Sequence, residues 1–207
     1  MLKLKYIVYA VLLMAFVIVA ASVFHSTRVH FRNKKEMSRY EGEKIALERD
    51  FGRVLVVYYS LSGHTRDIAK RIQEKTNADI YEIRTKEPLP SGMALNVRVI
   101  RQIRSENYPE IETDFPNFEK YDLIFVGAPV WWYTVATPAL SFLEQVDFKG
   151  KKVVPFSTQG SNPGTFERDF LHDARNAVVL TYRGFNNISP KFDAAVDNKI
   201  AIWLNGL

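Results

Sequence analysis

The stretch Val54-Leu-Val-Val-Tyr-Tyr-Ser-Leu-Ser-Gly-His-Thr65 decides the fold of this chain. Its first half, Val54 to Tyr59, is short, apolar on both faces and rich in β-branched and aromatic residues, which is typical of a strand buried between two layers of helices. Its second half is a hydroxyl-rich turn, and apolar side chains at helical spacing follow it. A helix that begins near Thr65 directs unpaired backbone N–H groups and the positive end of its dipole at this turn. The turn is therefore predicted to bind an anion.

The composition predicts a packed domain without any thiol chemistry. With 207 residues, 47% of them hydrophobic, the chain is large enough for one domain and an appendage. Cysteine is absent, which excludes disulfides, thiolate metal sites and a catalytic thiol, so any redox chemistry must come from a bound cofactor. Six of the 28 Lys/Arg lie in residues 1–35, which contain no Asp/Glu, leaving 22 against 23 acidic residues in the remainder. The basic charge thus belongs to the N-terminal segment, and we expect no nucleic-acid partner.

Residues 6–24 are predicted to form a single membrane-spanning helix after a short tail of residues 1–5. None of these 19 residues is charged, and a helix of this length nearly matches a hydrocarbon core of roughly 30 Å. One alternative is a cleaved signal peptide, for which Val19-Ala20-Ala21 offers a small-residue cleavage pattern, and another is a buried core helix. The membrane anchor is favoured because the run exceeds a usual signal-peptide core and charges follow it at once.

The residues on either side of this run bear on its orientation. Four basic residues follow the span closely, whereas two lysines and the amino terminus precede it. The positive-inside rule therefore favours, by this small margin, a cytoplasmic domain on a single-pass membrane protein. Residues 25–52 are expected to be a solvated connector, first basic and then of mixed charge, with a helical conformation as one interpretation of its second part.

Residues 53–207 alternate between predicted strands and helices. Strands are expected at 54–59, 80–83, 123–127, 152–157 and 177–180. Helices are expected to begin near Thr65, at Thr137 as the N-cap before Pro138, and at Thr165, and a last helix carries apolar side chains from 196 to 204. Five strands that alternate with helices imply right-handed crossovers. The sequence thus predicts an α/β fold with a doubly wound, five-stranded parallel sheet, preceded by the transmembrane helix.

The segment between the second and third predicted strands carries three arginines at helical spacing, Arg98, Arg101 and Arg104. One interpretation is a clamp for a phosphate group. The favoured interpretation is a helix that presents a charged face to water.

Three loops are expected to carry the function, because ligands of such sheets bind beyond the carboxyl ends of the strands. The first loop, residues 60–65, offers three hydroxyls and backbone N–H groups, with Gly63 free to adopt positive φ. The loop lacks the Gly-Lys-Ser/Thr ending of a P-loop, which argues against nucleoside triphosphate hydrolysis. His64 is interpreted as a donor of its backbone N–H rather than as a catalytic base. The alternative for this loop is an ordinary capped strand-to-helix turn.

The other two loops suit a flat ligand. In residues 127–134, Trp131, Trp132 and Tyr133 follow a strand directly and lie outside any periodic face, which favours a ring-binding wall over a core role. Residues 157–164 are small and polar, so the backbone can approach the polar edge of such a ring. A plain strand-to-helix turn explains this third loop almost as well. No residue is predicted to act as a general acid or base or to bind a metal.

Taken together, Ser60-Leu-Ser-Gly-His-Thr65 and Gly127-Ala-Pro-Val-Trp-Trp132 resemble the flavodoxin superfamily over residues 53–207. The match is to the branch with a Ser-x-Ser/Thr-Gly-x-Thr phosphate loop and a Gly-x-Pro-x-Trp-Trp segment. The resemblance implies the strand order 2-1-3-4-5 and noncovalently bound flavin mononucleotide (FMN). The phosphate-binding residues it implies are Ser60, Ser62, Gly63, His64 and Thr65. Those that would border the isoalloxazine ring or face its pyrimidine side are Pro129, Val130, Trp131, Trp132, Thr158, Gln159, Gly160 and Ser161.

The chain departs from this pattern in three respects. The first is the predicted N-terminal membrane span, which is no part of the basic family pattern. Tyr133 stands where relatives often carry a small residue, so it can cover or crowd the ring. The domain carries a net charge near zero, whereas the electron carriers of the family tend to be strongly acidic.

The function implied is a membrane-anchored FMN-binding flavoprotein that transfers electrons, as a carrier or as a reductase of quinone-like or other small acceptors. Its expected partners are a redox protein or a small acceptor such as a quinone, and the membrane. The alternative is a flavodoxin-like interaction module that has lost cofactor binding.

Overall fold

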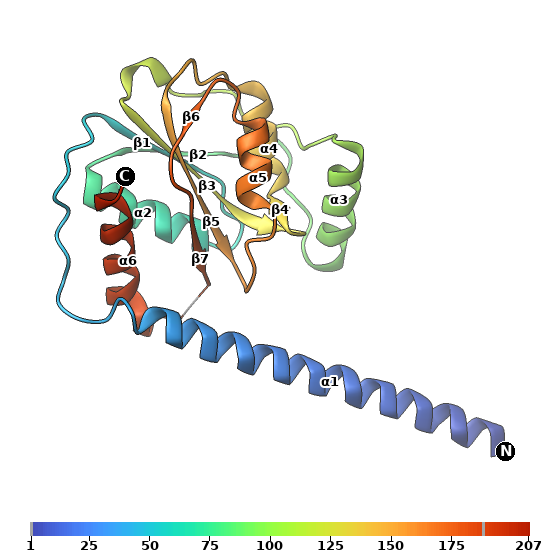
Figure 1. Cartoon of the computed structure of the whole chain (residues 1–207). Helices are drawn as coiled ribbons and strands as arrows, with labels where there is room; N and C mark the ends of the chain where they lie inside the picture. Colours follow the sequence, from blue (N-terminus) through green and yellow to red (C-terminus); the bar gives the residue numbers. More distant parts are fainter. Residues whose placement is uncertain (1, 188) are drawn as a thin grey trace.

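The computed structural model describes residues 2–187 and 189–207 of the chain. Helices and strands alternate through the part that follows the N-terminal helix, as the sequence predicts (Figure 1). In chain order the elements are α1 (Leu2–Met37), β1 (Val54–Tyr58), α2 (His64–Thr76), β2 (Asp79–Glu82), α3 (Gly92–Ser105), η1 (Phe118–Lys120), β3 (Leu123–Trp131), β4 (Thr134–Val135), α4 (Thr137–Gln145), β5 (Lys152–Gln159), α5 (Phe166–Asp173), β6 (Val178–Val179), β7 (Arg183–Asn186), η2 (Pro190–Phe192) and α6 (Asp193–Asn205).

Helix α1 is longer than the predicted span of residues 6–24. It has 36 residues and continues to Met37, because the sequence contains neither proline nor glycine that would end it at the last apolar residue. Residue 1 of the predicted tail lies outside the described residues, and the rest of the tail belongs to α1. By length and composition α1 can cross a membrane, and its most apolar window is not buried against the domain. The buried core helix is therefore wrong, which leaves a membrane anchor or a signal sequence.

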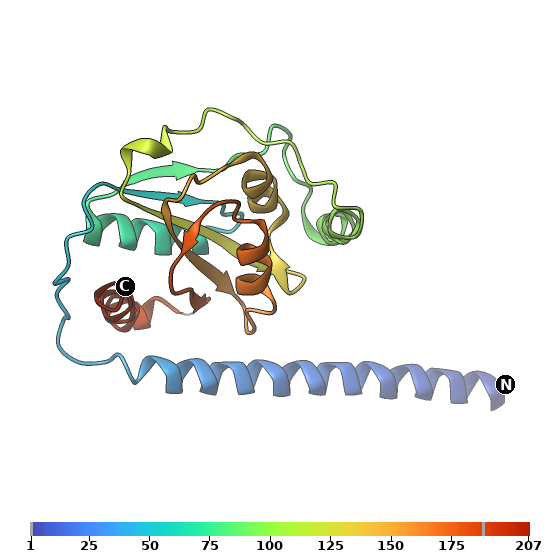
Figure 2. The same cartoon turned by 45° about the horizontal axis from the view of Figure 1, so that its top comes forward.

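The segment between α1 and β1 is not helical, which corrects the helical interpretation of the connector. After a turn at residues 38–40, the chain runs without regular structure along α6 as far as β1 (Figure 2). Two asparagines of α6 hold it through backbone contacts: Ile45 N donates to Asn198 Oδ1 at 2.9 Å and Glu48 N to Asn205 Oδ1 at 2.9 Å. Because these side chains satisfy the polar groups of the backbone, the segment needs no helical hydrogen bonds.

The parallel sheet has the expected order, β2-β1-β3-β5-β6, which confirms the doubly wound architecture. The predicted count of five strands is wrong, since the sheet has seven strands. The fifth position is divided: β6 pairs with the start of β5, and β7 pairs with its end. The other additional strand, β4, runs antiparallel to the end of β3 and forms a hairpin with it.

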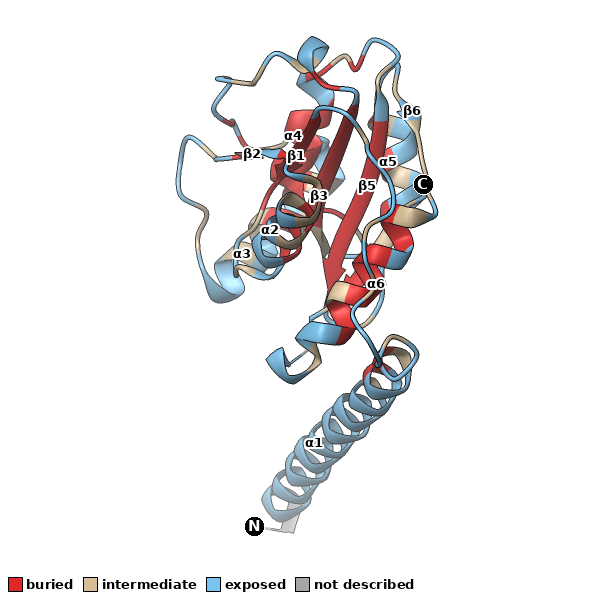
Figure 3. Cartoon of the chain, turned by 90° about the vertical axis from the view of Figure 1, so that its left-hand side faces the viewer, coloured by how far each residue is buried: buried red, intermediate tan, exposed pale blue. Residues whose placement is uncertain are grey.

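Two layers of helices enclose the sheet, whose central strands are buried (Figure 3). Helices α2 and α6 cover one face, where Trp203 meets Phe125 of β3 edge to face. Helices α4 and α5 cover the other face, where Phe142 and Phe166 are fully buried. Helix α3 lies outside α4 at the margin of the domain (Figure 1). The sheet thus forms a rigid support for the loops at its carboxyl edge.

The start of α4 differs by one residue from the prediction. The N-cap is Ala136, not Thr137, and no side chain caps the helix. The Thr137 hydroxyl instead donates to Gln102 Oε1 of α3 at 2.9 Å, in a buried contact. Pro138 lies in the first turn, as expected. Because Thr137 binds Gln102, its side chain joins α4 to α3 rather than completing a cap.

Candidate functional site

The first loop joins β1 to α2 and leaves polar groups available. Gly63 is the N-cap of α2 with φ of 93°, and no side chain caps the helix. Its N–H donates to Ser60 Oγ at 3.1 Å. The N–H groups of the first turn of α2 have no acceptor within the helix, since the acceptors would precede it. Ser62 is exposed, so its hydroxyl and these N–H groups form a set of neutral donors that suits an anion.

Two side chains at the end of this loop, those of Thr65 and Arg66, already have partners within the protein. Thr65 is buried, and its Oγ1 lies 2.8 Å from Thr158 Oγ1 of β5, which joins the first loop to the third. Arg66 pairs with Glu82 of β2 at 2.6 Å. Its pKa is raised, chiefly because its guanidinium donates to that carboxylate. The cation nearest to the loop in sequence is thus already neutralised by Glu82.

The second loop is the turn of the β3–β4 hairpin. Trp131 pairs with Thr134, so the turn consists of Trp132 and Tyr133 alone. Both have positive φ, 48° and 67°, a conformation that two-residue hairpin turns require and that bulky residues rarely adopt. Trp131 is half-buried and meets the ring of Tyr59 edge to face, at 5.5 Å between centroids. The turn residues are exposed, Trp132 by 50% and Tyr133 by 63%.

The segment that precedes α5 supports the strained turn. The backbone N–H of Thr165 donates to Tyr133 O at 2.7 Å. Gly164 lies so close that a Cβ there would come within 2.1 Å of the same oxygen. Asp169 Oδ2 accepts the hydroxyls of Thr134 at 2.6 Å and of Thr165 at 2.5 Å. Burial raises the pKa of Asp169, but these hydrogen bonds and Arg168 more than offset it, so its pKa lies below the usual value.

The third loop begins at the end of β5, where consecutive hydrogen bonds connect its side chains to the neighbouring strand. Ser157 Oγ donates to Gln159 Oε1 at 2.8 Å and lies 2.5 Å from the Tyr182 hydroxyl. Burial raises the pKa of Tyr182, although the hydrogen bond with Ser157 opposes it. Gln159 Nε2 donates to Asn186 Oδ1 of β7 at 3.2 Å. These contacts fix the amide group of Gln159 at the edge of the pocket described below.

The last turns of α1 bind to the same region. Asn186 Nδ2 donates to Asn33 Oδ1 at 2.8 Å, and the Arg32 guanidinium donates to Ser161 O of the third loop. Glu36 pairs with Lys199 of α6 at 2.7 Å, and the Lys199 side chain is only 4% exposed. Burial lowers the pKa of Lys199, although the Glu36 carboxylate opposes this shift. The helix that can span a membrane is thus attached directly beside the third loop.

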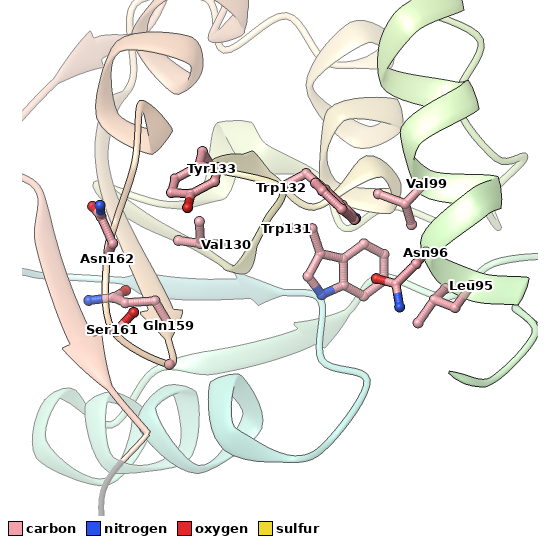
Figure 4. A pocket seen from close by; sticks show the side chains of 11 residues that line it. Leu95, Asn96, Val99, Val130, Trp131, Trp132, Tyr133, Gln159, Ser161 and Asn162 are labelled. Carbon is pink, nitrogen blue, oxygen red and sulfur yellow. The ribbon is translucent and has the colours of Figure 1, made fainter. Parts of the chain in front are cut away.

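A pocket of about 400 Å³ lies between the hairpin, the third loop and α3 (Figure 4). In Figure 4 the two tryptophans extend toward α3, whereas Tyr133 lies on the side of Asn162. The lining residues are Leu95, Asn96, Val99, Val130, Trp131, Trp132, Tyr133, Gln159, Gly160, Ser161 and Asn162.

The structure brings the predicted residues of the second and third loops together around one pocket, but not those of the first loop. Six of the residues predicted in the second and third loops line this pocket. Pro129 and Thr158 lie directly beside it as a pair in the register of β3 and β5. The first loop does not line the pocket. It is connected to the strand beside the pocket by the hydrogen bond between Thr65 and Thr158. His64 and Thr158 line a smaller hollow next to α6.

Five pocket residues were not predicted as site residues, namely Leu95, Asn96 and Val99 of α3, Asn162, and Tyr133, which was expected only to cover or crowd the ring. Helix α3 follows β2 at the carboxyl edge of the sheet, so the rule that placed the other loops also applied to it. The arginines of α3, on which its interpretation from the sequence was based, lie on a different face of the helix from these residues.

The residues present fit a phosphate-bearing flat ring. Hydroxyl and N–H donors lie at the start of α2, an aromatic hairpin lies across the pocket, and the fixed amide of Gln159 offers a polar contact. A phosphate binds well at a helix N-terminus without a cationic side chain. The site therefore provides a separate binding surface for each end of such a ligand.

Comparisons with known proteins agree with this assignment. A family model described as Flavodoxin matches residues 53–191. A flavoprotein from Lactobacillus acidophilus NCFM, solved in complex with FMN, is 28% identical and superposes over 64% of this chain and 92% of its own, with a TM-score of 0.59. A flavoprotein candidate from Bacteroides uniformis ATCC 8492 is 25% identical over 74% and 97% of the two chains, with a TM-score of 0.60. No curated protein matches the sequence. Since the family model spans more than half of the residues, the chain belongs to the flavodoxin family.

Proposed function

We propose that this protein is a membrane-anchored, FMN-binding flavoprotein that transfers electrons, either as a carrier between proteins or as a reductase of quinone-like or other small acceptors. The observation that carries the proposal is the contact between Thr65 and Thr158, which joins the donor-rich first loop to the strand that leads into the pocket. The relative from Lactobacillus acidophilus, whose structure contains FMN, supports the choice of cofactor.

The chain's own residues would divide the work of binding. Ser60, Ser62 and Thr65, with the N–H groups at the start of α2, would hold the phosphate. Trp131 and Trp132 would cover the ring and exclude water from it. When bound, FMN supplies the redox chemistry, while the protein binds and orients it. We assign no side chain as a general acid or base.

Helix α1 supports the membrane part of the proposal. It is exposed along its apolar length, and basic residues follow that length closely. We place the domain on the cytoplasmic side by the positive-inside rule. An anchor of this kind confines the domain near lipid-soluble acceptors and membrane redox proteins, which are the partners that we propose.

The first experiment measures FMN binding by the full chain purified in detergent. We expect the visible absorption of a flavin, either as purified or after FMN is added. The double variant Ser62→Ala with Thr65→Ala should lose about 100-fold in affinity, because two hydrogen bonds to a charged group are removed. Thr65→Ser, which keeps the hydroxyl, is the matched control and should bind nearly as well as the original chain.

The second experiment tests electron transfer. The FMN-loaded chain is reduced with a nicotinamide donor and mixed with a set of quinones, and reoxidation of the flavin is followed by absorbance. Reoxidation faster than with free FMN supports the reductase function.

A chain that binds no FMN in the first experiment, even after FMN is added, would instead favour the interaction module.

A further inference from the structure

Helix α3 is the least embedded helix that covers the sheet. Of its 14 residues, only Val99 and Gln102 are buried. Met93 is 82% exposed and Val97 is 54% exposed. Exposed apolar side chains on a helix next to a binding pocket indicate a surface that another component covers.

The exposed face of α3 combines apolar and basic residues. Met93, Val97, Arg101 and Arg104 follow one another at intervals of four, four and three, which places them on one side of the helix. The helix itself contains no acidic residue. Glu87, which lies 3.9 Å from Arg98, and Glu110 belong to neighbouring segments that border the same side of the helix. A shallow hollow of about 390 Å³ runs along this face between Val97 and the two arginines. In helices that lie in a membrane interface, apolar side chains enter the lipid while basic side chains beside them stay at the headgroups.

The attachment of α1 places α3 on the side of the bilayer. The contacts of Asn33 with Asn186 and of Glu36 with Lys199 fix the direction in which α1 leaves the domain. In Figures 1 and 2, α3 lies on the side toward which α1 runs to its N-terminus. Residues 25–37 add roughly 20 Å of helix beyond the predicted span, and the domain lies beside this part. The same geometry that anchors the domain therefore directs α3 at the membrane.

We infer that the exposed face of α3, defined by Met93, Val97, Arg101 and Arg104, rests on the anionic surface of the bilayer that holds α1. The inference depends on the proposed anchoring by α1. The charge is complementary, since the cytoplasmic leaflet carries anionic lipids that attract arginine. Because the opposite side of α3 lines the pocket through Leu95, Asn96 and Val99, this contact places the pocket one helix diameter, roughly 10 Å, from the lipid surface. A lipid-soluble acceptor then has only a short distance to cover between the bilayer and the pocket.

The absence of cysteine makes a direct test possible. Single cysteines are introduced into the full chain at Val97→Cys on α3, at Val17→Cys within the apolar run of α1, and at Lys120→Cys in η1, and each is labelled with a nitroxide. The chain is placed in nanodiscs of phosphatidylcholine alone or of equal parts phosphatidylcholine and phosphatidylglycerol. Paramagnetic resonance then compares collisions with dissolved oxygen, which enters lipid, and with a nickel chelate, which stays in water.

We expect labels 17 and 97 to favour oxygen in the anionic discs, and label 120 to favour the chelate in both disc types. Replacing Arg101→Glu and Arg104→Glu together should return label 97 to water without moving label 17. If label 17 favours oxygen while label 97 favours the chelate in anionic discs, α3 does not rest on lipid, and the inference fails alone. If label 17 favours the chelate, the proposed anchoring fails and the inference fails with it.

Discussion

The first loop, residues 60–65, and the hairpin turn of Trp132 and Tyr133 border the same site, yet the chain holds them in different ways. A Cβ added to Gly63 would meet nothing within 4 Å, and no side chain caps the helix that follows. The hairpin turn, in contrast, is fixed by the hydrogen bond from the Thr165 N–H to Tyr133 O and by the close approach of Gly164. One loop is open and incompletely bonded, and the other is strained and firmly supported.

This difference assigns different tasks to the two loops. An anion that binds the first loop would supply the acceptors that the start of α2 lacks, so we expect FMN to stabilise this region. Bulky residues at positive φ persist only where the surrounding structure holds them. The support of the hairpin by Gly164, Thr165 and Asp169 therefore keeps its aromatic rings in place before any ligand arrives.

The strongest test of the comparison replaces one glycine from each loop. Gly164→Ala should lower the free energy of unfolding by about 2–4 kcal/mol, because the new methyl group would overlap Tyr133 O and because φ there is positive. Gly63→Ala should cost only about 1–2 kcal/mol, from backbone strain alone. Thermal unfolding of both variants without FMN measures the difference. Equal losses of stability would show that the hairpin is not held more firmly than the first loop.

Whether the third loop is open or firmly supported can be tested by weakening the attachment of α1 beside it. Glu36→Gln leaves the Lys199 charge, which is only 4% exposed, without its partner. We expect stability to fall by about 2 kcal/mol, less than for a fully buried pair since Glu36 is partly exposed. The control is Glu41→Gln, at an exposed position just after α1. A third loop that depends on α1 should also lose FMN affinity in Glu36→Gln, whereas unchanged affinity would show that the loop is independent of α1.

The sequence was sufficient wherever a local pattern decided the structure. The apolar run before Ser60 is buried on both faces, so its composition alone predicts a central strand. Strand β7 escaped prediction because Arg183 to Asn186 contain a single large apolar residue, and only pairing with β5 makes this segment a strand. The two residues of β4 give too short a pattern to detect.

The site shows the same division between local and distant information. The loops after β1, β3 and β5 could be found because topology places them at one edge of the sheet. The contribution of α3 to the pocket was missed, since its arginines lie on another face than Leu95 and Val99. The contact between Glu36 and Lys199 joins residues 163 positions apart. No spacing in the sequence indicates that α1, which is long and apolar enough to cross a membrane, also binds the domain.

A smaller effect is expected from Asp169, which supports the hairpin through hydroxyl groups. Its pKa is lower in the folded chain, so its contribution to stability is complete above its unfolded pKa of about 3.9 and is lost as the pH falls through the folded value. Asp169→Asn should therefore cost about 1 kcal/mol at neutral pH and progressively less in acid. Unfolding of both chains from pH 7 to pH 2 measures this, with the exposed Glu167→Gln as control. A constant difference across that range would exclude a role for the Asp169 charge.

The smallest effect on stability should come from relieving the strain in the hairpin itself. Asn followed by Gly suits a two-residue turn with positive φ, so Trp132→Asn with Tyr133→Gly should raise stability by up to about 1 kcal/mol. Little packing is lost, because both rings are at least half exposed. FMN affinity should fall up to about tenfold as one tryptophan of the wall is removed.

Tyr133→Gly alone separates the strain of the turn from its role in ring binding, since it relieves part of the strain and keeps both tryptophans. If the single variant binds FMN more tightly than the original chain, Tyr133 restricts entry to the pocket; if it binds less tightly, Tyr133 is part of the ring-binding surface.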